Sequence, residues 1–250
     1  MCRIAAYLGP ERALADVIIT PDHSLLEQAH HAAEAKLAVN GDGFGMAWYG
    51  QPKAPELYRD VLPAWSDGNL PSLCRTIRSK LFLAHVRAGT YGETSRANCH
   101  PFAYGRWAFM HNGQCQGFDQ ARRALEAALP DDLYHHRNGT TDSELFFLLM
   151  LADGLEQDPV EAFHRTYARV AAHCQGPLRF AVVLTDGRSI WAFRYASDNR
   201  CPTLYLSKAF PNGGQAVASE PLDGCPHNWT AIKPNSALCL TAEGAIASAA

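Results

Sequence analysis

The sequence predicts an α+β protein with large antiparallel sheets, and three observations support this fold class. Short apolar stretches rich in aromatic and branched side chains, typical of buried strands, occur near both ends of the chain. Two long helical patterns occupy the middle of the sequence. Asp186-Gly187 separates two apolar stretches, which is a strong short-range hairpin signal. Strands at both ends around central helices are typical of α+β proteins.

The first third of the chain predicts three strands and one helix. CRIAAYL (2–8) is an apolar stretch and predicts the first strand. SLLEQAHHAAEAKLA (24–38) predicts a helix, because Ser24 and Glu27 have the spacing of a capping box. Two further buried strands are expected at FGMAWY (44–49) and LFLAHVR (81–87).

The remaining elements follow in the order strand, two helices, strands. YGRWAFMHNG (104–113) predicts a strand that runs into a turn at Asn112-Gly113. The helices are expected around 142–155 and 159–174, the second with Pro159 at a position suited to a first helical turn. The last strands are expected at 178–185, 188–196, 203–207, 215–219 and 237–241.

Length and composition indicate one folded domain over residues 1–250. A chain of 250 residues exceeds the usual ~100–200 of one domain but stays within the range of large β-rich domains. Hydrophobic residues make up 47% and charged residues 19%, which is typical of an ordinary globular protein. No internal repeat, low-complexity segment or linker-like stretch divides the sequence.

Charge and cysteine patterns exclude several function classes. The net charge is −3 with no basic run, which argues against nucleic-acid binding. No apolar run reaches the ~18 residues of a membrane span, and no signal peptide begins the chain. The protein is therefore expected in the cytoplasm, away from membranes. Its eight cysteines form no C-x-x-C pair, so thiols are expected, with no metal site and no cofactor.

Cys2 stands directly behind the initiator Met1. If Met1 is removed, Cys2 carries a nucleophilic thiol and a free α-amine on one α-carbon. An α-amine has a reference pKa of roughly 7.7–8.0 and can act as the base that a thiol needs. The alternative is that Cys2 merely begins a buried strand as a small hydrophobic residue.

Arg87 ends an apolar strand, where its guanidinium needs an anionic partner. A bound carboxylate would fit this requirement, and so would an internal Asp or Glu. His85, on the same face of that strand, is expected to be a core histidine whose ring nitrogens are satisfied by hydrogen bonds. The cluster NGDG at 40–43 predicts a tight loop before a strand.

Two further stretches hold polar groups at the borders of apolar segments. Asn112 and Gly113 could offer a side-chain amide and a backbone N–H to one oxygen, which is the composition of an oxyanion hole, or could simply form a hairpin turn. Thr141 or Asp142 could cap the helix that follows. Asp142 could also receive a substrate ammonium beside a pocket.

Taken together and in order, these residues resemble the class II glutamine amidotransferases, the N-terminal-cysteine branch of the Ntn hydrolases. The resemblance rests on Cys2 after Met1 and on HVRAGT, NCHP, HNG and TDSE, and ASEPL at 218–222 extends it over most of the chain. The pattern is similar to stand-alone members linked to glutathione degradation and to γ-glutamyl cleavage in ergothioneine synthesis.

The resemblance implies a four-layer αββα fold and hydrolysis of a small γ-glutamyl amide, either glutamine or a γ-glutamyl peptide or conjugate, through a cysteine thioester. In such a site an amide and a backbone N–H stabilise the oxyanion, an arginine binds the α-carboxylate and an aspartate binds the α-ammonium. The residues implied here are the catalytic Cys2, Asn112 and Gly113 and the substrate-binding Arg87, Thr90 and Asp142.

The sequence departs from the family pattern in two respects. Sugar-aminating relatives follow the arginine with a tryptophan and later a histidine, whereas Ala88 and Tyr91 stand at these places, and the small residue would leave room for a substituted amide. No synthase domain follows, so transfer of ammonia would need a separate synthase partner. The alternatives are therefore a glutaminase subunit for such a partner, or a non-catalytic γ-glutamyl-binding module if Met1 is retained. A papain-like hydrolase ranks lower, and the family resemblance allows a homodimer.

Overall fold

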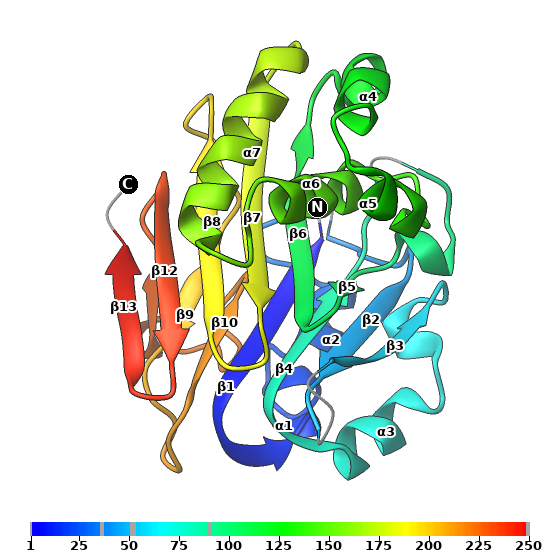
Figure 1. Ribbon diagram of the computed structural model, residues 1–250. Coiled ribbons are helices and arrows are strands. Elements are labelled where there is room, and N and C mark those ends of the chain that lie inside the picture. Colours follow the sequence, from blue (N-terminus) through cyan, green and yellow to red (C-terminus); the bar gives the residue numbers. More distant parts are fainter. Residues whose placement is uncertain (1, 36–37, 51–53, 90–91, 249–250) are drawn as a thin grey trace.

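Two antiparallel sheets lie face to face between two layers of helices (Figure 1). The computed structural model describes residues 2–35, 38–50, 54–89 and 92–248. The predicted α+β class and the four-layer αββα arrangement are both confirmed. Within the described residues, no helix has the length and apolar character needed to cross a membrane.

The first sheet has seven strands. They are β1 (Arg3–Ala13), β2 (Phe44–Trp48), β3 (Glu56–Asp60), β4 (Arg78–Val86), β9 (Tyr205–Ser207), β10 (Gln215–Ala218) and β11 (Trp229–Ala231). Their spatial order is β11-β9-β10-β1-β4-β2-β3, so the first strand of the chain lies at the centre of the sheet. The outer face is covered by the helices α1 (Ala15–Ile18), α2 (Leu25–His30) and α3 (Leu70–Thr76).

The second sheet has six strands. They are β5 (Phe102–Tyr104), β6 (Trp107–Cys115), β7 (Leu178–Thr185), β8 (Ile190–Ala196), β12 (Ser236–Thr241) and β13 (Gly244–Ser248). Their order is β13-β12-β8-β7-β6-β5. The outer face is covered by α4 (Phe118–Glu126), α5 (Asp131–His136), α6 (Asp142–Ala152) and α7 (Pro159–His173). Short 3₁₀ turns lie at Ala64–Ser66, Arg96–Asn98 and Pro226–Asn228.

Three apolar cores separate the four layers, and β1 shows how the sequence specifies them. Ile4, Ala6 and Leu8 belong to the core between the sheets. Ala5 and Tyr7 point the other way, into the core under α1, α2 and α3. Because side chains alternate along a strand, a strand buried on both faces is apolar throughout. This explains why CRIAAYL lacks the alternating pattern of a half-exposed strand.

The helix expected over 24–38 is much shorter in the structure. Ser24 caps it as predicted, since its hydroxyl accepts a hydrogen bond from the backbone N–H of Glu27 at 3.2 Å. The helix α2 ends at His30, however, and the backbone N–H groups of Ala33 and Glu34 donate to the distant carboxylate of Glu220. These two amides therefore cannot form the hydrogen bonds that would continue the helix, and the predicted helix beyond His30 is wrong.

The turn expected at Asn112-Gly113 is also wrong, because β6 continues through both residues to Cys115. Asn112 pairs with Ala181 of β7, and Gly113 pairs with Phe180. Glycine is required at position 113 because the backbone of β7 lies very close to it, and not because the chain turns there. A Cβ at this position would lie 1.8 Å from the carbonyl oxygen of Arg179. The hairpin expected at Asp186-Gly187 is confirmed, with β7 and β8 paired on either side.

Candidate active site

A small cavity of about 30 Å³ brings together four residues that the sequence analysis selected. Its wall includes Cys2, Arg87, Gly113 and Asp142, which come from four separate parts of the chain. In Figure 1, the N-terminal end of the chain and α6 lie at the same end of the sheets. Asn112 does not line this cavity, although its neighbours His111 and Gly113 do. Thr90 lies outside the described residues.

Cys2 immediately precedes β1 and lies beside the end of β4. The two strands pair with Arg3 opposite Val86, which brings the thiol to the backbone of Ala88. The backbone N–H of Ala88 donates to Cys2 Sγ at 3.4 Å, and the thiol lies 3.5 Å from the Ala88 carbonyl oxygen. Burial raises the pKa of the Cys2 thiol, and the Ala88 hydrogen bond offsets only part of this. The thiol is therefore protonated near neutral pH and needs a base before it can attack.

Arg87 is buried at the end of β4 and is held by the loop that precedes β2. Its backbone N–H donates to the Gly43 carbonyl at 2.8 Å, and its carbonyl accepts from the Asp42 N–H at 2.9 Å. Its Nη1 donates to the Asp42 carbonyl at 3.2 Å. The Asp42 carboxylate accepts from the Gly89 N–H at 2.8 Å. The tight loop expected from NGDG thus fixes the strand end that carries the guanidinium.

The backbone of β6 is open on the side that faces the cavity. The strand β5 pairs only with residues 107–109, so it does not cover Gly113. The N–H of Cys115 donates to Asp142 Oδ2 at 3.0 Å. Because N–H directions alternate along a strand, the N–H of Gly113 points to the same side as that of Cys115. A backbone donor therefore faces the cavity from a position fixed by the sheet.

The side chain of Asn112 is fully buried, yet neither its amide nitrogen nor its oxygen has a hydrogen-bond partner among the described residues. Buried side-chain amides are nearly always hydrogen-bonded. An unused donor adjacent to Gly113 is therefore an unsatisfied group that a bound oxygen could engage.

Asp142 is the first residue of α6 and points its carboxylate toward β6. Thr141 caps the helix, because its hydroxyl accepts from the Glu144 N–H at 3.2 Å. Capping is thus performed by Thr141, whereas the carboxylate of Asp142 lines the cavity and accepts from the Cys115 N–H at 3.0 Å and the Ser143 hydroxyl at 3.3 Å. The capping role weighed from the sequence therefore belongs to Thr141, and the role of Asp142 in binding a substrate ammonium stays a prediction.

Two residues that sequence reasoning did not select hold the loop before Asp142. The carboxylate of Glu144 accepts from the N–H groups of Asn138 at 2.9 Å and Gly139 at 2.6 Å. Asn98 accepts from the Thr140 N–H at 2.7 Å and donates to the Thr140 hydroxyl at 3.0 Å. Contacts to backbone N–H groups leave no pattern of residue types in the sequence. The only signal that could have indicated a role for Asn98 and Glu144 is therefore their place in the motifs NCHP and TDSE.

Two buried histidines, His100 and His111, line the cavity, a third, His85, stacks on His100, and all three are neutral at pH 7. Burial lowers the pKa of His85 to about 3 and holds the pKa of His100 well below its ordinary value. Burial also lowers the pKa of His111, while the Asp142 carboxylate opposes this shift. The rings of His85 and His100 stack with their centroids 4.1 Å apart. His85 is buried in the core as expected, but it is not fully satisfied: Nε2 lies 3.4 Å from the His111 carbonyl oxygen, whereas Nδ1 has no hydrogen-bond partner among the described residues.

None of these three histidine rings forms a hydrogen bond with the thiol of Cys2 among the described residues. His111 Nε2 lies 3.2 Å from the Arg179 carbonyl and Nδ1 lies 2.9 Å from the Ser143 hydroxyl, so Nε2 carries the proton. Among the described residues, Ala88 alone hydrogen-bonds the Cys2 thiol. The described part of the chain also contains no cluster of three metal-ligating side chains.

Comparison with protein families gives one match over most of the chain. The family model described as glutamine amidotransferases class-II matches residues 20–223. The chain is 31% identical to the probable glutamine amidotransferase DUG3 of Saccharomyces cerevisiae, over 96% of this chain and 82% of that protein. It is 28% identical to the gamma-glutamyl-hercynylcysteine sulfoxide hydrolase of Mycolicibacterium smegmatis, over 93% and 92% of the two chains.

Solved structures agree with this match. A glutamine aminotransferase class-II domain protein from Silicibacter pomeroyi has a TM-score of 0.78 and 39% identity, and the alignment covers 99% of this chain and 98% of that one. The glutamine phosphoribosylpyrophosphate amidotransferase of Bacillus subtilis has a TM-score of 0.69 at 16% identity, over 99% of this chain and 49% of that one. The second likeness concerns the fold alone.

Proposed function

This chain belongs to the class II glutamine amidotransferases, and we propose that it hydrolyses a small γ-glutamyl amide, glutamine or a γ-glutamyl peptide or conjugate, through a thioester at Cys2. The single observation that carries the proposal is the cavity whose wall brings together the thiol of Cys2, the guanidinium of Arg87, the carboxylate of Asp142 and the backbone of Gly113. Relatives over nearly the whole chain carry the names of a glutamine amidotransferase and a γ-glutamyl hydrolase.

The charges on the cavity wall suit the α-amino-acid end of a γ-glutamyl group. Arg87 supplies a guanidinium for the α-carboxylate, and Asp142 supplies a carboxylate for the α-ammonium. Charge-assisted hydrogen bonds of this kind are the strong ones and are directional. With both ends of the amino acid bound, the γ-carbonyl extends toward Cys2. Thr90 is assigned to the same end of the substrate by its place in HVRAGT.

In the proposed mechanism, removal of Met1 frees the α-amine of Cys2. This amine takes the thiol proton, through a water, as Sγ attacks the γ-carbonyl carbon and forms a C–S bond. The carbonyl oxygen becomes an oxyanion that accepts hydrogen bonds from the Gly113 N–H and the Asn112 amide. One donor of this kind contributes about 2.7–4 kcal/mol to stabilising such a transition state.

The oxyanion then collapses, the C–N bond breaks, and the amine leaves with the proton held by the Cys2 α-ammonium. Water attacks the glutamyl thioester, with the α-amine again accepting a proton. Breakage of the C–S bond releases the γ-carboxylate of the product and returns the thiol. The amine therefore alternates between base and acid within one turnover.

A glutaminase that passes ammonia to a separate synthase is the second candidate. This chain shares its fold with an amidotransferase chain about twice as long, of which it spans 49%. A cytoplasmic location, one domain over residues 1–250, a homodimer and a synthase partner all stay predictions from the sequence.

A substrate panel tests the proposal. We expect the purified chain, trimmed of Met1, to hydrolyse at least one γ-glutamyl amide, with Cys2→Ala folded and inactive. Cys2→Ala retaining full activity would contradict the thioester route. A rate with glutamine that rises sharply only when a co-purified protein is added would favour the second candidate, and binding without turnover would favour a non-catalytic module.

A further inference from the structure

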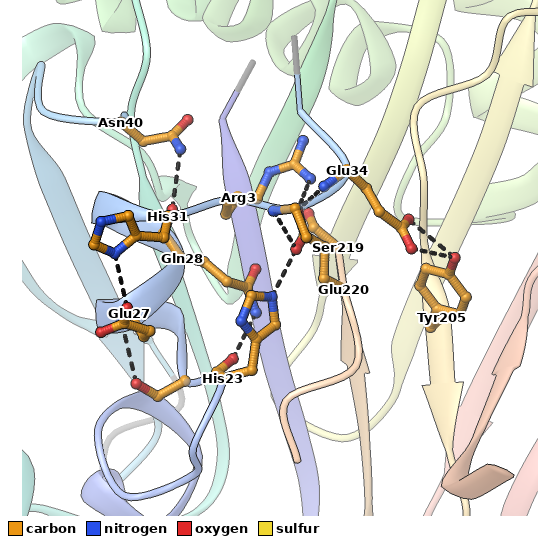
Figure 2. Close-up of polar contacts among 12 residues, drawn as sticks. Arg3, His23, Glu27, Gln28, His31, Glu34, Asn40, Tyr205, Ser219 and Glu220 are labelled. Carbon is orange, nitrogen blue, oxygen red and sulfur yellow. Dashed lines mark hydrogen bonds and ion pairs between the residues drawn. The ribbon is translucent and has the colours of Figure 1, made fainter. Parts of the chain in front are cut away.

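The carboxylate of Glu220 lies buried beside the start of β1, in the ASEPL motif that the mechanism above does not use (Figure 2). Glu220 follows β10, the neighbour of β1 in the first sheet. It accepts from Arg3 Nη1 at 2.8 Å and from the N–H groups of Ala33 and Glu34, each at 2.9 Å. Arg3 and Glu34 donate to Oε1 and Ala33 donates to Oε2, and His23 Nε2 also lies 2.7 Å from Oε2. Glu220 thus gathers three segments that are far apart in the sequence.

Arg3 connects this carboxylate to the nucleophile. Its side chain is completely buried, and its Nε donates to the carbonyl oxygen of Cys2 at 2.6 Å. One guanidinium therefore contacts Glu220 and the peptide unit of Cys2 at the same time. Its planar donors have fixed relative directions, so the position of Glu220 determines where the Cys2 carbonyl is held.

Ser219 secures the next residue of the same strand. Its hydroxyl accepts from the Ile4 N–H at 2.9 Å, and its own N–H donates to the Ile4 carbonyl at 2.9 Å. Residues 219 and 220 therefore hold the first residues of β1 through backbone groups and one guanidinium.

Stability alone does not account for a fully buried ion pair at this place. Removing two charges from water costs free energy that their attraction does not reliably return, and apolar replacements are often as stable. Burial by itself would raise the pKa of Glu220, but His23, the two backbone amides and Arg3 lower it below its ordinary value. The carboxylate is therefore ionised and fully engaged at neutral pH.

We propose that Arg3 and Glu220 are positioning residues that hold the Cys2 peptide unit in one orientation and thereby direct its thiol and α-amine at the cavity. This inference rests on the proposed function. The same carboxylate holds Ala33 and Glu34, which precede the loop that fixes Arg87. Glu220 therefore also links the nucleophile to the substrate-binding side of the cavity.

The test measures kcat, KM and the unfolding midpoint for Arg3→Lys, Glu220→Gln and the double variant on the best γ-glutamyl amide. Lysine keeps the charge but lacks the guanidinium fork. We expect each single change to lower kcat about 100-fold, because small misplacements of reacting groups have effects of this size. KM should change less than about threefold. Because the two residues act as a unit, the kcat of the double variant should be at most about threefold below the kcat of the less active single variant.

Asp153→Asn is the matched control. It removes a carboxylate–arginine pair with Arg169, but at the other end of α6 from Asp142. We expect a lower unfolding midpoint and an unchanged kcat. A folded Glu220→Gln or Arg3→Lys with wild-type kcat would overturn the inference, as would a kcat loss matched by the control. A wild-type chain inactive on every γ-glutamyl amide would instead remove the proposed function, and this inference with it.

Discussion

At the scale of the residue, Asn112 is a buried amide that the fold does not use. Both of its polar side-chain atoms lack partners among the described residues, which is a cost to stability. We predict that Asn112→Ala lowers kcat by about 100–1,000-fold, the loss expected for one oxyanion donor. The unfolding midpoint should stay level or rise, because an unsatisfied amide is removed.

Steady-state kinetics and thermal unfolding of the same preparation check this prediction. A matched change at Asn138, whose side-chain amide donates to the nearby carbonyl of His136, should leave kcat unaltered. Unchanged turnover in Asn112→Ala would remove this residue from the oxyanion site and leave Gly113 as the donor.

Asp142 makes a separate prediction, because its proposed partner is a single functional group of the substrate. Asp142→Asn should weaken selection for the α-ammonium, which we measure as the ratio of kcat/KM for glutamine and for glutaramate, its analogue without the amine. A hydrogen bond to a charged group contributes about 1.5–3 kcal/mol, so the ratio should fall by about 10- to 100-fold. The same ratio in Asp142→Asn and in the wild type would exclude Asp142 as the ammonium ligand.

At the scale of the element, the pairing of β6 with β7 depends on the absence of a side chain at Gly113. A Cβ there would lie 1.8 Å from a β7 carbonyl and 2.4 Å from His111 Nε2. Gly113→Ala should therefore separate the strands and lower the free energy of unfolding by more than about 4 kcal/mol, an exceptional loss for one residue. Gly68→Ala is the control, since a Cβ there meets nothing within 4 Å. Urea unfolding of both variants checks this, and equal stability would refute the close approach.

The neutral histidines on β4, β6 and the segment before β5 make folding sensitive to acid. The unfolded chain protonates its histidines below about pH 6.5, whereas native His85 stays neutral until about pH 3. The unfolded state therefore binds more protons between these limits, and stability falls as pH falls.

We predict that the free energy of unfolding drops from pH 7 to pH 5, and that His85 contributes about 1.4 kcal/mol per pH unit to this drop once the pH is below 6.5. His85→Phe should reduce this slope. Denaturant titrations at several pH values measure the slope. A slope independent of His85 would mean that the histidine is protonated in the native state.

These elements also show what the sequence could predict about the fold. Strands such as CRIAAYL were predictable because burial on both faces leaves an apolar run. The length of α2 was not, because a carboxylate almost two hundred residues away takes the amides that would continue the helix. The strand at Asn112-Gly113 was mistaken for a turn because Asn-Gly suits a hairpin locally, and only the approach of β7 explains the glycine.

At the scale of the whole molecule, the site draws on both sheets and on the helical layer outside the second sheet. Cys2 and Arg87 come from adjacent central strands of the first sheet, Gly113 from the second sheet, and Asp142 from the start of α6. No local sequence pattern predicts that residues so far apart in the chain meet in one cavity. Their assignment to one site therefore came from the family resemblance and not from their spacing in the sequence. Asn98, Glu144, Arg3 and Glu220 escaped selection because their partners are mostly backbone groups or side chains distant in the sequence.

The most direct test of the account is the mass of the N-terminal peptide after incubation with a diazo-ketone analogue of glutamine. The account predicts a chain without Met1 that carries one adduct on Cys2, and protection by excess γ-glutamyl substrate. An unmodified Cys2 in a chain that has lost Met1 would contradict the assignment of the cavity as a γ-glutamyl site.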